Sequence, residues 1–205
     1  MKHYPDMIPI FPLSGVIYFP KTNLPLNIFE QRYLDLINEA YNKDKLMGMV
    51  QTKRESNSVY KVGCLGKIND YHKSKDGRIL INLTGITRFK IVEEIKNQKL
   101  YREFKVDYEM FKGHTTDIKE KVESSHLIEK AKIFFKRNGL LLNWKEFEKL
   151  DQNQKINTLA MIAPVTNEEK QKILETVTLN EKVKALESII TFYLHEVSFS
   201  NQTIQ

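Results

Sequence analysis

Residues 8–41, IPIFPLSGVIYFPKTNLPLNIFEQRYLDLINEAY, contain a change of apolar pattern that predicts the order of the first elements. Three short apolar runs come first, and Pro12, Gly15, Pro20 and Pro25 interrupt them. Proline removes a donor from a strand ladder and glycine permits a positive φ angle. These breaks therefore predict turns between strands rather than a helix.

The apolar pattern then changes to one residue in every four. The residues on this spacing, with two apolar neighbours, are Phe29, Tyr33, Ile37, Tyr41, Leu34 and Ala40. Such a spacing predicts one apolar face of an amphipathic helix. Strands, then a helix, then more strands predict a barrel with a helix closing one end.

Glycines shape the strands expected after this helix. Those within residues 59–73 predict a bulge or tight curvature, which a small closed barrel needs. Asp76-Gly77 predicts a tight hairpin turn because both residue types tolerate the positive φ angles of such turns. Gly85 interrupts the alternation of residues 78–95, which predicts a long bent strand or two strands meeting there.

The second half of the chain has a helical apolar period almost throughout. The polar residues 112–117, KGHTTD, are the expected boundary between a first domain, 1–112, and a second, 113–205. Asn138-Gly139 predicts the end of the first helix beyond it. Capping boxes that predict the starts of later helices are Asp151/Gln154, Thr166/Glu169 and Thr178/Glu181.

Several segments resemble one protein family. FPLSGVIYFP, LPLNIFEQRY and LTGITRFKI resemble the N-terminal domain of Lon proteases, called the LON substrate-binding domain. TLAMIAPVTNEEKQKILETVTLNEKVKALESII is similar to the helical part of that domain, so the resemblance covers about residues 7–197. It implies an α+β fold, with an N-terminal PUA-like β-barrel carrying one helix and a C-terminal helical bundle. It also implies a role in gripping protein substrates.

Composition predicts a soluble globular protein of the cytoplasm. The chain has 205 residues, of which 41% are hydrophobic and 28% charged. No apolar run approaches the roughly 18 residues that a membrane helix needs. The first residues contain no long apolar stretch typical of a secretory signal. The single cysteine, Cys64, excludes an internal disulfide, and its strand-like surroundings predict a buried, unreactive thiol.

The basic excess lies in the first half. Through Lys112 there are 19 basic and 13 acidic residues, whereas the two signs balance beyond it. A modest basic field can steer nucleic acid, and it is equally ordinary as a solvated surface. Because PUA-like barrels include RNA binders, RNA binding is the alternative hypothesis. Its candidate side chains are Arg88, Phe89, Lys90, Tyr101 and Arg102, although strand alternation separates Phe89 from the two flanking cations.

Motifs for catalysis are missing from the sequence. It contains neither a G-x-x-x-x-G-K-[ST] phosphate loop nor a G-x-S-x-G elbow. The five histidines are far apart and lack metal-ligand spacing. We therefore expect no catalytic residues, metal or cofactor, and no hydrolysis of peptides or ATP.

The main hypothesis, which the resemblance implies, is a non-catalytic module that binds unfolded or exposed hydrophobic polypeptide segments, or a protein partner. An enzyme with an unrecognised site is a third alternative. Apolar residues near the N-terminus either line a groove for peptide or fill the barrel core. Aromatic residues near residue 140 either form a partner-binding cleft or pack the helices together. The candidates are Tyr18, Phe19, Leu24, Leu26, Phe134 and Trp144.

Overall fold

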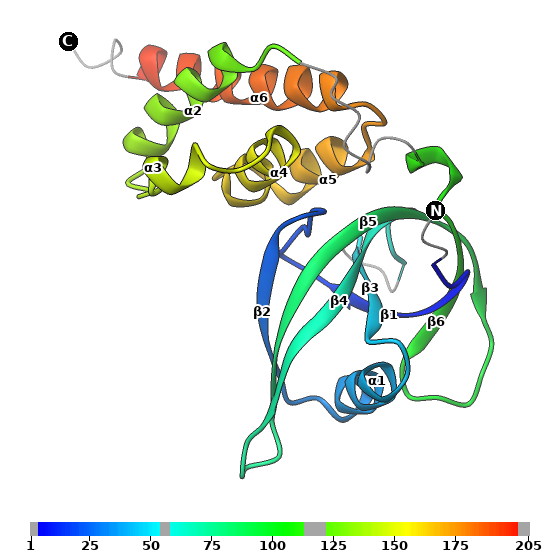
Figure 1. Cartoon of the computed structure of the whole chain (residues 1–205). Helices are drawn as coiled ribbons and strands as arrows, with labels where there is room; N and C mark the ends of the chain where they lie inside the picture. Colours follow the sequence, from blue (N-terminus) through cyan, green and yellow to red (C-terminus); the bar gives the residue numbers. More distant parts are fainter. Residues whose placement is uncertain (1–3, 54–57, 113–121, 201–205) are drawn as a thin grey trace. The chain divides into compact units, whose positions relative to one another are not determined.

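The computed structural model describes residues 4–53, 58–112 and 122–200. The chain forms two compact units, which we call the strand unit, Met1–Thr116, and the helical unit, Asp117–Gln205. Over the described residues the fold mixes a six-stranded sheet with six helices (Figure 1). The polar stretch 112–117, expected as a domain boundary, falls mostly outside the described residues.

The strand unit holds all six strands and one helix. Its elements are β1 (Met7–Leu13), β2 (Asn23–Ile28), α1 (Gln31–Asn42), β3 (Leu46–Gln51), β4 (Val62–Lys73), β5 (Ile79–Ile95) and β6 (Arg102–Asp107), followed by a 3-10 turn, η1 (Glu109–Phe111). The sheet order is β2-β5-β4-β3-β1-β6, and β6 also pairs with β5. Five strands therefore pair in a closed ring, from which β2 extends as a sixth strand (Figure 1).

Strand β5 makes this closure possible because it is long enough to hold two different neighbours on one edge. Its first part, Ile79–Thr84, pairs with β2, and its last part, Lys90–Ile95, pairs with β6. The opposite edge pairs with β4 along most of its length. The predicted long bent strand is thus confirmed, with the bend near Gly85 between the two partners.

Position 85 must be a glycine because another part of the backbone passes very close to it. A Cβ atom added there would lie 2.3 Å from the carbonyl oxygen of Phe19 and 2.9 Å from the Cα of Pro20. The backbone of the preceding turn crosses directly over this glycine. Two backbone hydrogen bonds fix the crossing, from Lys21 N to Gly85 O and from Gly85 N to Thr22 O, both at 2.9 Å.

Apolar side chains fill the interior of the ring. Its buried cluster consists of Ile8, Ile10, Val50, Leu65, Phe89, Ile91, Phe104 and Val106. Helix α1 contacts β1 and β3 and buries Tyr33, Leu36, Ile37 and Ala40. The predicted Asp76-Gly77 turn is confirmed, with φ +90° at Gly77 and a hydrogen bond of 2.8 Å from Ser74 N to Arg78 O.

Two expectations about the opening stretch were wrong. Phe29 does not belong to the buried face of the helix, because α1 begins at Gln31 and Phe29 is 66% exposed. The middle apolar run, residues 16–19, is not a strand. It is an irregular segment whose last three residues are buried, because the turn that follows takes a positive φ at Lys21 and crosses over Gly85.

The helical unit consists of α2 (Ser125–Arg137), α3 (Trp144–Phe147), α4 (Gln152–Ile162), α5 (Asn167–Glu175) and α6 (Leu179–Ser200). All three predicted capping boxes are present at the starts of α4, α5 and α6. Helix α2 ends as predicted, with Asn138 as its C-cap and φ +69° at Gly139.

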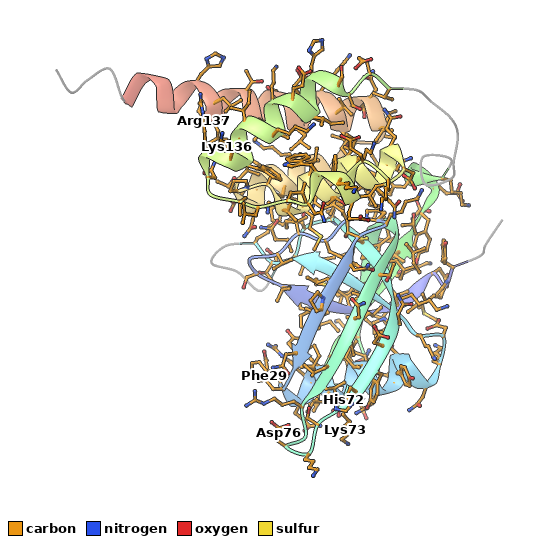
Figure 2. The ribbon with its side chains drawn as sticks, turned by 60° about the vertical axis from the view of Figure 1, so that its left-hand side comes forward. Phe29, His72, Lys73, Asp76, Lys136 and Arg137 are labelled. Atoms are coloured by element: carbon orange, nitrogen blue, oxygen red, sulfur yellow. The ribbon has the colours of Figure 1, made fainter. Side chains whose placement is uncertain are left out.

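Helices α2 and α6 pack side by side and run in the same direction. Lys130 Nζ lies 2.8 Å from Glu187 Oε1. About two helical turns further along both helices, Arg137 donates to the carbonyl oxygen of Leu194 at 3.0 Å. Figure 2 labels Arg137 at the end of α2. The fully buried side chains of this unit include Leu127, Ala131, Ile156, Leu159, Leu186 and Ile190.

Candidate functional site

Strand β2 leaves one edge of the sheet open. It pairs with β5 on one side, and no other strand among the described residues pairs with it. Pro25 lies opposite Asn82 in this pairing. Gly85 N donates to Thr22 O at 2.9 Å, so the backbone of Thr22 faces β5, and by strand alternation the next residues of β2 that face β5 are Leu24 and Leu26. Pro25, which has no N–H, takes a position that faces away from β5. Leu24 and Leu26 therefore bond to β5, while the backbone of Asn23, Pro25 and Asn27 points to the open edge.

One face of β2 is apolar and only half covered. Leu24, Leu26 and Ile28 lie opposite Leu83, Ile81 and Ile79 of β5, respectively. The three β5 residues and Ile28 are buried, whereas Leu24 and Leu26 are half-buried. Two of the candidate residues thus form a partly open apolar row beside an unpaired backbone edge. This combination is the strongest candidate binding feature of the strand unit.

The other face of β2 is polar and solvent-exposed. Thr84 Oγ1 donates to Asn23 Oδ1 at 2.6 Å, and Asn69 Nδ2 donates to Thr84 Oγ1, which links β2, β5 and β4. This cross-strand ladder fixes the register of β2, because a one-residue slip would move its apolar row to this face. Phe29 follows the strand, and Figure 2 shows it at the same end of the sheet as His72, Lys73 and Asp76.

Tyr18 and Phe19, the other candidates near the N-terminus, belong to the core. Their exposed fractions are 2% and 0%, so neither presents a surface to a ligand. The Tyr18 hydroxyl has no hydrogen-bond partner among the described residues, and burial raises its pKa well above the usual range. Core packing, the second interpretation offered for these residues, is what the structure shows.

Phe134 and Trp144 lie in the helical unit. Phe134 is buried, with its ring centroid 5.8 Å from that of Tyr193. Trp144 is half-buried between Phe135, at 6.1 Å, and Phe147, at 5.3 Å. These rings pack α2, α3 and α6 together. The six candidates therefore divide into core residues, one strand-edge pair and a helical aromatic cluster.

The side chains considered for RNA do not form a common platform. Arg88, Phe89 and Tyr101 are each no more than 5% exposed. The Arg102 guanidinium donates two hydrogen bonds of 2.7 Å to the Glu94 carboxylate. Of the five side chains, only that of Lys90 is largely exposed to solvent. Base stacking needs exposed rings beside free cations, and this set does not offer them.

A charged cluster ties the β5–β6 loop to α1. Lys99 Nζ lies 2.6 Å from Glu39 Oε1 and 2.9 Å from Glu103 Oε1, and the Tyr101 hydroxyl donates to Glu39 at 2.5 Å. Hydrogen bonds from Lys99 and Tyr101 lower the pKa of Glu39. Burial and the bond to Glu39 raise the pKa of Tyr101 to about 12. Every member has a partner, so the cluster stabilises the fold.

The described residues contain no group of three or more His, Cys, Asp or Glu side chains placed to hold a metal ion. Cys64 is fully buried, as its sequence context predicted. A cavity of about 20 Å³ between the start of β1 and α1 has room for roughly one water molecule. Within the described part of the chain, no helix is both long and apolar enough to cross a membrane.

Comparison with known proteins identifies the family. The profile of the ATP-dependent protease La (LON) substrate-binding domain matches residues 7–191. The chain belongs to this family. This LON domain is 27% identical to Lon protease of Syntrophus aciditrophicus over 93% of its own length, and 23% identical to that of Bacillus thuringiensis over 90%. It spans about a quarter of the length of these curated relatives.

Solved structures show the same fold. The Lon N-terminal domain protein from Xanthomonas campestris matches this LON domain with a TM-score of 0.67 at 18% identity, covering 89% of this chain and 97% of the other. The N-terminal domain of the Mycobacterium avium complex Lon protease matches with a TM-score of 0.65 at 15% identity, covering 90% and 98%. The matched family profile describes a substrate-binding domain.

Proposed function

We propose that this chain acts as a non-catalytic LON domain that binds unfolded or exposed hydrophobic segments of polypeptide. We also propose that its ring of strands is a PUA-like barrel and its helical unit a bundle of the LON type. The observation that carries the proposal is the family match over residues 7–191, because that family is defined by substrate binding. The relatives are Lon proteases, so a link to proteolysis follows as part of the same proposal.

The surface chemistry supports polypeptide as the ligand. Leu24 and Leu26 form a half-covered apolar row, and Phe29 is 66% exposed close by in sequence. Such a surface can bind apolar side chains, which are buried in the core of a folded protein and become accessible when the protein unfolds. Because burial of apolar area does not depend on counterions, the resulting affinity should change little with salt.

The test is a titration of the chain with one protein in two states. Reduced, carboxamidomethylated α-lactalbumin supplies the unfolded state, and the native, disulfide-bonded protein is the matched control. We expect saturable binding of the unfolded form at low and high salt and none of the native form. Equal binding of both forms, or none of either, would contradict the proposal.

RNA is not favoured as the ligand because four of the five side chains considered for it are buried or paired, which leaves Lys90 without an exposed ring of the set beside it. A parallel titration with structured RNA checks this point. Phosphate contacts would make the affinity fall steeply with salt concentration. We expect no such salt-sensitive binding.

A further inference from the structure

We propose that the open edge of β2 binds an extended polypeptide segment as an added β-strand. This inference rests on the proposed function and specifies where and how the polypeptide is held. Three observations carry it: the unpaired backbone groups of the edge, the half-covered apolar row beside them, and a proline that disfavours self-pairing.

The first observation concerns backbone groups. Asn23, Pro25 and Asn27 are all exposed and direct their carbonyl oxygens to the open edge. Only the two asparagines have an N–H to direct there, because Pro25 has none. The edge thus offers three acceptors and two donors. An extended segment alternates N–H and C=O groups along its edge and satisfies all five.

The second observation concerns side chains. Alternate residues of an added strand stand on the same face as Leu24 and Leu26 and pack beside them. The half-buried state of both leucines leaves apolar surface for such neighbours. The edge therefore selects segments with apolar residues at every second position. Segments of that pattern form the buried strands of folded proteins and become available when those proteins unfold.

The third observation argues against a second copy of this chain. When two β2 strands pair antiparallel with Asn23 of each copy opposite Asn27 of the other, the two Pro25 residues lie opposite each other. That pair makes neither of its hydrogen bonds, and the two rings occupy the space where the donors should be. A foreign segment without proline at that point loses one bond rather than two. Proline on an edge strand is a recognised barrier to such self-pairing.

The opposite edge of this three-stranded region is less suitable. There the last residues of β4 pair with β5, and the Tyr71 ring stacks on Tyr41 of α1 with a centroid distance of 4.4 Å. The Tyr71 hydroxyl also donates to Asn38 Oδ1 at 2.7 Å. Helix α1 therefore covers the apolar face beside the β4 edge, whereas the face beside β2 remains half open.

Residue-resolved amide hydrogen exchange tests the backbone prediction. In the free chain, the Leu24 and Leu26 amides should be protected by β5, while the Asn23 and Asn27 amides exchange rapidly. Saturation with the carboxamidomethylated α-lactalbumin should slow exchange at both asparagines by about tenfold or more. If the polypeptide binds and exchange at Asn23 and Asn27 is unchanged, the strand-edge inference is wrong and the proposed function stands. If the polypeptide does not bind, the proposed function itself fails.

A proline substitution tests the same edge by affinity. Asn27→Pro removes an outward donor without removing a bond to β5, so the fold is kept and we expect about tenfold weaker binding. Lys73→Pro is the matched control, because Lys73 lies opposite Ile79 on the other edge, with its N–H turned away from β5. Figure 2 shows Lys73 near the hairpin. Amide exchange of β5 verifies that each variant is folded. Equal affinity of both variants and the parent chain, or weaker binding by Lys73→Pro alone, overturns the inference.

Discussion

The substitution Gly85→Ala perturbs the point at which the turn after Phe19 crosses over β5. The added methyl carbon would lie 2.3 Å from the Phe19 carbonyl oxygen and 2.9 Å from Pro20 Cα, and both are backbone atoms that no rotamer change can move. Overpacking of this kind costs about 1–3 kcal/mol. Displacing the turn also weakens the two 2.9 Å hydrogen bonds at Gly85, each contributing about 0.5–1.5 kcal/mol. We therefore expect a loss of about 3 kcal/mol in the free energy of unfolding.

Amide exchange of the buried residues of β4 and β5 measures this loss in the strand unit itself. A loss of about 3 kcal/mol corresponds to exchange about 100-fold faster than in the parent chain. Gly77→Ala is the comparison, since its added carbon meets nothing within 4 Å and only the positive φ opposes it. We expect a smaller effect there, about 1–2 kcal/mol. Exchange in Gly85→Ala indistinguishable from that of the parent would refute the account of the crossing.

Three further predictions concern caps, charge and burial. Asp151→Ala removes the side-chain acceptor of a capping box and should lower the free energy of unfolding of the helical unit by about 1 kcal/mol. Denaturation followed by the fluorescence of Trp144 measures this loss. An unchanged unfolding midpoint would contradict the prediction. Glu39→Gln tests the carboxylate whose pKa is lowered, chiefly by the hydrogen bond from Lys99. Because the folded pKa lies below the unfolded value, the contribution of Glu39 is full above about pH 4.5 and disappears as pH falls through the folded pKa. The free energies of unfolding of parent and variant should therefore differ at neutral pH, by less than about 1 kcal/mol for this exposed pair, and become equal in acid. A difference that grows as the pH falls would contradict this prediction. Tyr18→Phe removes a buried hydroxyl that has no hydrogen-bond partner among the described residues. We therefore expect an equal or higher midpoint of thermal unfolding. A much lower midpoint would mean that the hydroxyl stabilises the fold.

Local signals in the sequence predicted the local features of the fold. The capping boxes, the Asp76-Gly77 turn and the helix end before Gly139 depend on residues within a few positions of each other, so their chemistry is readable directly. The bend at Gly85 was readable because the glycine breaks an otherwise regular alternation. The closing of the ring was predicted only as a general shape, because the pairing of β1 with β6 joins residues nearly a hundred positions apart.

The failures have a physical cause in common. Phe29 fits the helical spacing of its neighbours, but the helix begins two residues later and leaves its ring in solvent. The run at 16–19 has the composition of a strand, but no strand in the described part of the chain pairs with it where the chain crosses Gly85. In both cases tertiary placement overrides the local pattern.

The candidate site was predictable in part. Apolar composition identified Leu24 and Leu26, yet it also selected Tyr18 and Phe19, because the sequence does not distinguish a buried apolar residue from a half-exposed one. The direction of the Pro25 backbone depends on its register with Asn82, which only the structure supplies. That register makes Pro25 a residue that shapes the open edge rather than one that simply ends a strand.

Site-specific photo-crosslinking shows whether unfolded polypeptide binds at the open edge of β2. A benzophenone side chain at position 26 would stand in the half-covered row beside the open edge, and one at position 100 replaces a leucine that is 65% exposed in the β5–β6 loop. With unfolded polypeptide at saturation, we expect strong crosslinks from position 26 and few from position 100. Equal yields from both positions, or crosslinks from position 100 alone, would contradict it.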